Sequence, residues 1–219
     1  MFVGHLAVAL GAKKIEPRLS LPALTTAAFG LDVLWPLFVI DGLEVVRIDP
    51  GNTKFTPLDF VSYPWSHSLA MSLVWGLLTA GVTFAVLRQT RAAVVMAVVV
   101  VSHWVLDWVS HRPDMPLWPD GPKLGLGLWN SIAGTFAVEG ALFAMGIAVY
   151  LRATRARDAV GRWAFVALVM VTSAAWLSGP FTPPPPSVTA LTTMSVMLIG
   201  VFLLWSAWID RHRSANSEF

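Results

Sequence analysis

The sequence predicts an all-α fold, a polytopic transmembrane helix bundle with about six spans, and three observations support that prediction. Hydrophobic residues make up 56% of the 219 residues and charged residues only 13%, which leaves little polar surface for a water-soluble domain. The apolar residues form blocks of roughly 18 or more rather than alternating, as is typical of membrane-spanning helices. Basic residues gather in short clusters between the blocks, as they do in loops beside a membrane.

Six segments are long and apolar enough to be spans, at 21–40, 68–87, 92–110, 125–151, 162–179 and 187–209. A short apolar segment, 2–12, precedes them and is too short to cross a bilayer, so we expect a half-helix packed within the bundle. No pair of helices broken by Gly or Pro stands out. We expect residues 1–213 to form one transmembrane domain and 214–219 to be a polar tail.

The distribution of charge predicts an orientation. If all six segments span, eleven basic residues share one side: Lys13, Lys14, Arg18, Arg88, Arg91, Arg152, Arg155, Arg157, Arg162, Arg211 and Arg213. The loops at 41–67, 111–124 and 180–186 share the other side and hold few cations. The positive-inside rule places the basic side in the cytoplasm. We therefore expect a multi-pass protein of the bacterial cytoplasmic membrane, with the other loops on the extracytoplasmic side.

Composition also excludes several kinds of site and partner. Cysteine is absent, which excludes disulfides, thiolate metal sites and a cysteine nucleophile. The net charge is only +2 and the basic residues lie between spans, so we expect no nucleic-acid partner. Membrane lipid is the partner that the composition indicates. The oligomeric state stays open.

Ionisable residues inside the apolar segments are candidates for function, because each costs roughly 2.5–3.5 kcal/mol to insert. His103, Asp107 and His111 are spaced i, i+4 and i+8, which stacks them on one face of a helix. With the orientation above, this face lies at the extracytoplasmic end of its span. His67 begins the preceding span from that side, and Asp32 lies in the same half of the first span. We expect these side chains to meet at one depth.

Imidazole nitrogen and carboxylate oxygen are ligands that suit Zn²⁺ and also Mn²⁺ or Fe²⁺. A bound cation would offset the cost of burying two carboxylates. The alternative is that each His or Asp only forms a hydrogen bond or ion pair between helices. No Lys or Arg lies in the corresponding halves of these spans, which favours the metal.

The order of the ligand-type residues along the chain carries a resemblance. That order is His5, Asp32, His67, His103-x-x-x-Asp107, His111 and Glu139. It resembles the ligand order of the bacterial zinc-dependent phospholipases C and the related zinc nucleases, which are helical proteins with three zinc ions. The sequence also resembles the YdjM-like family of inner-membrane proteins, described as metal-dependent hydrolases. The resemblance covers Gly4 to about Glu139 and is most specific in Ser66-His67-Ser68 and from Ser102 to Ser131.

The resemblance implies a principal metal site of four ligands, Asp32, His67, His103 and Asp107. It further implies that Asp107 bridges to a second ion held by His5, and that His111 and Glu139 serve a third ion. Thr135 stands where those proteins have a histidine, and Met1 stands where some of them have a processed tryptophan. We therefore expect one ion rather than three.

The loop from Arg112 to Leu128 is rich in Pro and Gly and has two interpretations. It is a tight interfacial turn, which Pro and Gly alone would explain. Alternatively, it is a lid in which Arg112 and Lys123 bind an anionic headgroup.

The first functional hypothesis is a metal-dependent hydrolase. A metal held by two His and two Asp lowers the pKa of bound water toward about 7, and Asp107 or Glu139 would act as the general base. The position of the site indicates a lipid-like substrate with a phosphoester bond. The alternative hypotheses are a proton or divalent-cation transporter that uses the same cluster, and haem ligation by His67 and His103.

Overall fold

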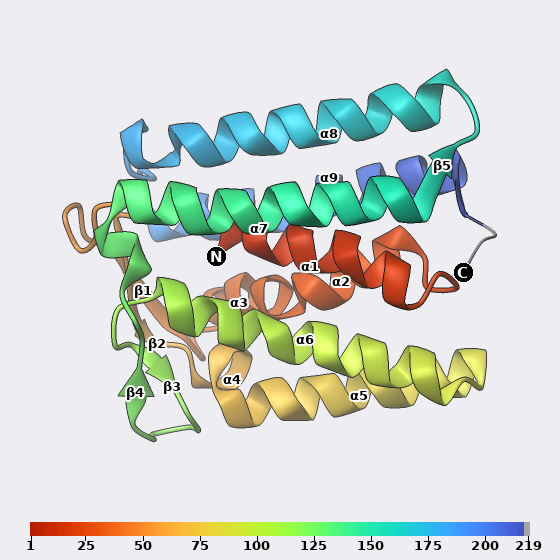
Figure 1. Cartoon of the computed structure of the whole chain (residues 1–219). Coiled ribbons are helices and arrows are strands. Elements are labelled where there is room, and N and C mark those ends of the chain that lie inside the picture. Colours follow the sequence, from red (N-terminus) through yellow and green to blue (C-terminus); the bar gives the residue numbers. More distant parts are fainter. Residues whose placement is uncertain (217–219) are drawn as a thin grey trace.

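The computed structural model describes residues 1–216 and is a bundle of helices with three two-stranded sheets at its ends (Figure 1). Its helices are α1 Phe2–Ile15, α2 Leu21–Ala28, α3 Gly30–Ile40, α4 Pro64–His67, α5 Leu69–Leu87, α6 Thr90–Ser110, α7 Ile132–Ala153, α8 Ala159–Ser178 and α9 Val188–Arg211, with 3-10 turns at Leu128–Asn130 and Gly179–Phe181. Its strands are β1 Val45–Ile48, β2 Leu58–Ser62, β3 Met115–Pro116, β4 Lys123–Leu124, β5 Thr154–Ala156 and β6 Arg213–Ala215. The all-α prediction is confirmed.

Five helices, α5 to α9, are long and apolar enough to cross a membrane, and α2 with α3 forms a sixth candidate span. This agrees with the predicted count and fits a multi-pass membrane protein. The sixth span differs from the prediction, because α2 and α3 meet at an angle of 53°. The sequence predicted no broken helix, whereas the structure contains one at α2–α3.

The break in the sixth span lies at Phe29, whose φ of −99° and ψ of 11° leave the helical region. The carbonyl of Ala28, just before the break, accepts a hydrogen bond from His103 Nδ1 at 2.7 Å. Non-helical backbone at membrane depth is tolerated where protein groups satisfy it. The break therefore supplies a backbone acceptor to a buried histidine of α6.

Helix α1 is short and buried inside the bundle, as predicted, and the N-terminus lies within the bundle, nearer the end that carries β1 and β2 (Figure 1). It packs closely along α7, because Gly146 has no side chain. A Cβ at Gly146 would lie 2.6 Å from Ala7 Cα, closer than atoms can approach. Small residues allow such close helix packing inside membranes. This contact fixes α1, and with it His5, against the bundle.

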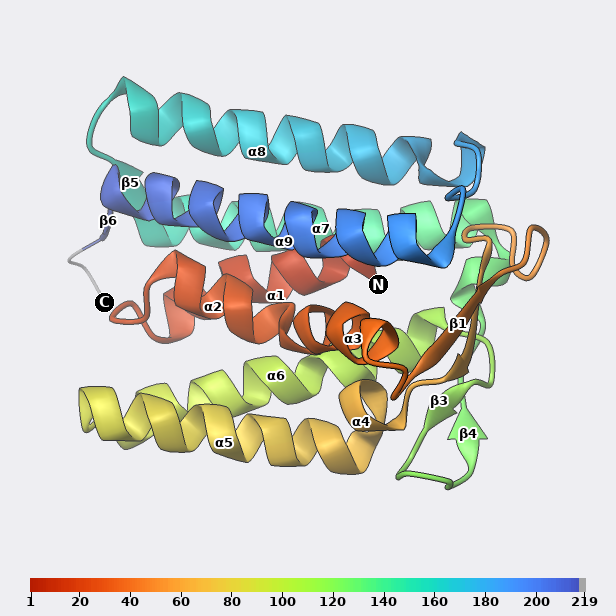
Figure 2. The same ribbon diagram turned by 180° about the vertical axis from the view of Figure 1, so that it is seen from behind.

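The two ends of the bundle differ. The hairpins β1–β2 and β3–β4 lie at one end, called here the hairpin end, together with α4 (Figures 1 and 2). The connections α1–α2, α5–α6 and α7–α8 lie at the opposite, basic end. The chain thus sorts its basic clusters to one end, as the alternation of charge predicts.

One predicted span begins later than expected. We expected a helix from residue 125, but α7 begins at Ile132, after Ser131 caps it by accepting a hydrogen bond from the Gly134 amide. The residues before the cap form a loop in which Gly127 has a φ of +72°. That left-handed conformation favours glycine and ends any helix there.

The predicted polar tail is partly ordered. Strand β6 pairs with β5, and the buried guanidinium of Arg213 donates hydrogen bonds to Thr154 Oγ1 and to the Gly161 carbonyl. Residues 214 and 215 of the predicted tail therefore belong to a strand that pairs with β5. The remainder of the predicted tail, 217–219, lies outside the described residues.

Candidate metal centre

Five of the predicted ligand residues converge between four helices. We call this set the inner cluster, and its members are His5 of α1, Asp32 of α3, His67 of α4, and His103 and Asp107 of α6. Their ligand atoms form two overlapping groups that share His103, namely His5 with Asp107 and Asp32 with His67, and the atoms of each group lie within 4.8 Å of one another. Apart from Asp32, all members are almost fully buried.

The separations between ligand atoms fit a small cation. Ligands at about 2.0–2.2 Å from a tetrahedral ion lie roughly 3.3–3.6 Å from one another. His67 Nε2 is 3.6 Å from Asp32 Oδ1 and 3.8 Å from Asp107 Oδ2. His103 Nε2 is 3.7 Å from Asp32 Oδ1 and 3.0 Å from Asp107 Oδ2. These four separations bracket the expected range.

The environment of His103 determines which nitrogen faces the cluster. Because Nδ1 donates its proton to the carbonyl of Ala28, Nε2 presents a lone pair in the neutral ring. Nε2 is buried and has no hydrogen-bond partner among the described residues, although Asp107 is close. A buried lone pair beside a carboxylate is unfavourable unless a proton or a metal lies between them.

His67 is oriented in the same way by two residues that the sequence analysis missed. Ser66 Oγ donates to Glu44 Oε2 at 2.7 Å, so it accepts from His67 Nδ1, which is 2.7 Å away. Glu44 also accepts from the backbone amides of Trp65 and Ser66. This leaves His67 Nε2 as a lone pair facing Asp32 and Asp107. Metal-binding histidines commonly have such carboxylate-linked support.

Glu44 is buried at the hairpin end, outside the spans, between α3 and β1. Burial raises the pKa of its carboxyl group, and the hydrogen bonds from Ser66 and Trp65 oppose that rise. No short motif links Glu44 to Ser66, because 22 residues separate them. Only the fold of the first hairpin brings them together.

His5 and the amino group of Met1 occupy the other side of Asp107. The imidazole of His5 stacks on that of His103 with ring centroids 3.7 Å apart, and its Nε2 is 3.1 Å from Asp107 Oδ1. The amino group of Met1 forms an ion pair with the same carboxylate oxygen. Asp107 therefore contacts groups from α1 and α6 at once, as a bridging carboxylate does.

Glu139, a predicted catalytic residue, is buried on α7 next to this side of the cluster. Its Oε1 accepts a hydrogen bond from Trp129 Nε1 at 3.4 Å, and its Oε2 has no partner among the described residues. The carboxylate also attracts the amino group of Met1. The structure does not place Glu139 in either metal group.

His111 does not join the inner cluster, although its spacing predicted that it would. Helix α6 ends at Ser110, and His111 has a φ of −69° and a ψ of 150°, so its side chain leaves the helical face. Its Nδ1 lies 3.0 Å from Asp114 Oδ1, and Tyr63 donates to the same oxygen at 2.7 Å. The expectation from the i, i+4, i+8 spacing is wrong because it required α6 to continue through His111, whereas α6 ends at Ser110.

Arg112 and Lys123 lie near His111 at the hairpin end, beside a shallow hollow. The guanidinium of Arg112 forms ion pairs with Asp59 and, at 3.3 Å, with Asp114. Lys123 Nζ donates to the carbonyl of Val61 at 2.8 Å. The ion pairs balance the charge of Arg112 within the protein. They favour a structural role for Arg112 over the binding of a headgroup.

The chemistry of the inner cluster fits a divalent metal ion. It offers the Nε2 lone pairs of His67 and His103 and two carboxylates, a set of ligands that suits zinc, manganese and iron. Among residues 1–216, no Lys or Arg side chain forms an ion pair with Asp32 or Asp107. Comparison with protein-family models, with curated proteins and with solved structures finds no match to this chain.

Proposed function

We propose that this protein is a membrane-embedded, metal-dependent hydrolase whose inner cluster holds a divalent ion, zinc in preference to manganese or iron. The observation that carries the proposal is the buried Nε2 atom of His103, which accepts no hydrogen bond from any residue of 1–216 and lies 3.0 Å from a carboxylate oxygen of Asp107. Asp32, His67 and His103 would hold the ion, with Asp107 completing the set. Such an ion supplies Lewis-acid activation of water at neutral pH.

Each residue around the ion would have a separate role. Asp107 would be a ligand through Oδ2, which lies 3.0–3.8 Å from two imidazole nitrogens, while its Oδ1 stays paired with Met1 and His5. Glu139 lies nearby with one carboxylate oxygen that has no partner within residues 1–216, and it would be the better candidate for the proton acceptor. Glu44 and Ser66 hold the ring of His67 in position without touching the substrate.

The substrate in this proposal is a phosphoester of a lipid-like molecule, hydrolysed near the extracytoplasmic face of the bacterial cytoplasmic membrane. The excess of basic residues at the opposite end supports this orientation through the positive-inside rule. The resemblance to YdjM-like proteins and to zinc-dependent phospholipases supports the reaction type.

A second candidate function is transport of protons or divalent cations through the inner cluster. The broken span α2–α3 favours it, because transporters often place broken helices at their binding sites. The residues between the inner cluster and the basic end argue against transport. There α1 and α6 contribute Leu6, Leu10, Met96, Val99 and Val100 to an apolar core, which offers no polar route.

Headgroup release from mixed phospholipid vesicles tests the proposal. Wild-type protein reconstituted with zinc should release headgroups, and His67→Ala should not. His212→Ala is the matched control, since His212 pairs with Asp158 at the basic end and should retain activity. Cation flux without headgroup release would replace the hydrolase with the transporter.

A further inference from the structure

The members of the inner cluster differ in how accessible they are. The side chain of Asp32 is 36% exposed, whereas those of His67, His103 and Asp107 are 5%, 0% and 3% exposed. The exposed part of Asp32 lies in the wall of a cavity of about 280 Å³ between α3 and α9. A molecule that reaches the inner cluster past Asp32 therefore comes through this cavity.

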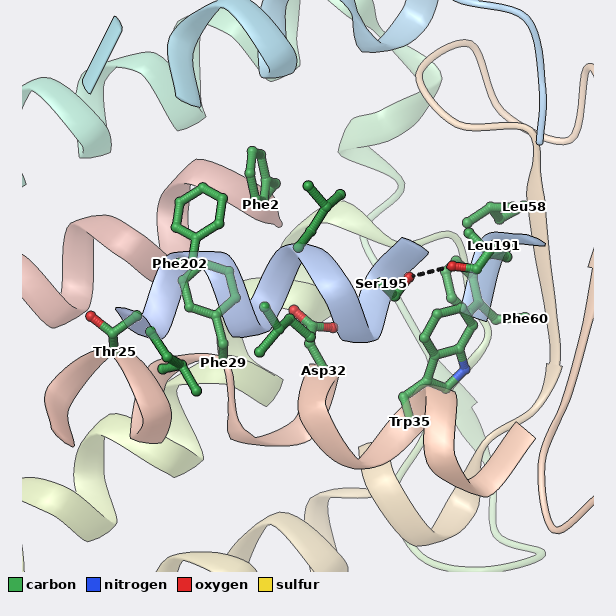
Figure 3. Close-up of a pocket in the computed structure, with 13 residues that line it drawn as sticks. Phe2, Thr25, Phe29, Asp32, Trp35, Leu58, Phe60, Leu191, Ser195 and Phe202 are labelled. Carbon is green, nitrogen blue, oxygen red and sulfur yellow. Dashed lines mark hydrogen bonds between the residues drawn. The ribbon is translucent and has the colours of Figure 1, made fainter. Parts of the chain in front are cut away.

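The walls of the cavity are almost entirely apolar, and Figure 3 shows the carboxylate of Asp32 pointing in among them. On one side, the rings of Phe2, Phe29 and Phe202 pack together with centroids 5.9–6.2 Å apart. On the other side, toward the hairpin end, lies Trp35 (Figure 3). Such walls favour hydrocarbon and disfavour a hydrated solute.

The position of the cavity points to the bilayer as the source of its ligand. Helix α9 is the least buried of the candidate spans, so most of its surface faces lipid. The cavity is lined by residues of this peripheral helix and of the broken span, and Figure 2 shows these elements lying next to each other. Hydrocarbon chains are the solvent at this depth of a membrane.

Two polar atoms on residues that line the cavity lack partners. Trp35 Nε1 and Thr25 Oγ1 are buried and have no hydrogen-bond partner among the described residues. Trp35 is three residues after Asp32, so the two side chains share one face of α3. In Figure 3 the indole nitrogen of Trp35 lies on the far side of its ring from Asp32, so an acceptor oxygen that pairs with it would lie further toward the hairpin end than the carboxylate.

We propose that this cavity binds the hydrocarbon chain of a membrane amphiphile with an anionic, oxygen-rich headgroup, which enters from the bilayer between α3 and α9. The inference rests on the proposed function, because only a cation at the inner cluster would make an anionic headgroup favourable beside Asp32. The chain lies against Phe29 and Phe202, and a headgroup or ester oxygen accepts from Trp35. The substrate class is thus a lipid phosphoester rather than a water-soluble one.

Photolabelling tests the proposal without requiring turnover. The full chain, zinc-loaded in phospholipid vesicles, is irradiated with dodecyl phosphate that carries a diazirine at the end of its chain. Labels mapped by mass spectrometry should concentrate on cavity residues such as Phe29 and Phe202. Ser195→Trp, which fills the cavity, should lower that labelling by about tenfold. Ile199→Trp is a second filling variant in case the first fails to fold.

Val201→Trp is the matched control, because Val201 lies on the same helix but is 51% exposed. It should leave the labelling of the cavity unchanged. Labels spread evenly over the lipid-facing sides of α8 and α9, and equal in both folded filling variants, would overturn the proposal. Loss of hydrolysis with cavity labelling retained would overturn the hydrolase and support the chain-binding site.

Discussion

Two buried groups of histidine and carboxylate lie toward the hairpin end of this bundle, and their charges are balanced differently. In the group around His111, Arg112 pairs with Asp59 and Asp114, and the Tyr63 hydroxyl donates to Asp114. Each carboxylate there faces a cation or a donor. In the inner cluster, the two imidazoles that face both Asp32 and Asp107 use their Nδ1 protons elsewhere.

The difference shows that residue type and spacing alone do not bring a histidine into a group that could hold a metal ion. His103 and His111 both belong to one run of sequence and both lie within 3.0 Å of a carboxylate oxygen. Their surroundings separate them. Arg112 pairs with both carboxylates of the group around His111, whereas in the inner cluster the amino group of Met1 pairs with Asp107, and Asp32 faces only the imidazoles of His67 and His103 among the described residues. A carboxylate that faces only imidazoles with lone pairs is the better candidate for a metal site.

The largest expected effect is the loss of metal binding when His103, but not His111, is exchanged for alanine. His103→Ala removes a ligand shared by both metal groups and should abolish stoichiometric zinc binding. His111→Ala should leave zinc binding intact, because His111 lies outside both groups. Elemental analysis of the two purified variants checks this. Equal zinc loss in both would erase the distinction between the two groups.

Loss of the hydrogen bonds that orient His67 should have a smaller effect on zinc affinity. Glu44→Gln and Ser66→Ala disturb the hydrogen bonds that orient His67, and such losses typically weaken metal affinity by about 10–100-fold. Competition with a zinc chelator measures the change. Asp114→Asn, which alters the group around His111, is the control and should not change affinity. Unchanged zinc affinity in both Glu44→Gln and Ser66→Ala would mean that the hydrogen bonds through Ser66 do not hold His67 in position.

How much of this could be predicted from sequence varies along the chain. The pairing of His103 with Asp107 follows from helical periodicity, which holds inside a long span. His111 could not be placed, because its position depends on where α6 ends. Glu44 and the break at Phe29 depend on contacts between distant segments, with Ser66 and with His103, which no local pattern encodes.

The packing of α1 gives a prediction for stability. Gly146→Ala places a methyl group against Ala7 and should destabilise the fold by roughly 1–3 kcal/mol, while also displacing His5. Gly200→Ala is the control, because nothing lies within 4 Å of the Cβ position there. Thermal unfolding in detergent compares them. Equal melting temperatures would show that α1 packs elsewhere.

The smallest expected effect is a titration that concerns only the group around His111. Burial and the neighbouring Asp114 raise the pKa of Tyr63 well above its ordinary value of about 10. The folded state then holds the phenol proton more tightly than the unfolded chain does. This contribution to stability is complete below about pH 10 and is lost as the pH rises toward the folded-state pKa.

Tyr63 can be observed alone, because the chain has two tyrosines and Tyr150→Phe removes the other. Tyrosinate absorbance in this variant should stay absent at pH 10 and appear only at higher pH, with or after unfolding. A normal titration in folded protein would show that the phenol is exposed to water and that the group around His111 is open.

The metal content of the wild-type protein, purified without added chelator, tests the central claim most directly. We expect about one divalent ion per chain, zinc in preference to others, bound through Asp32, His67 and His103. A fully folded chain that takes up no divalent ion, even when zinc is supplied in excess, would contradict it.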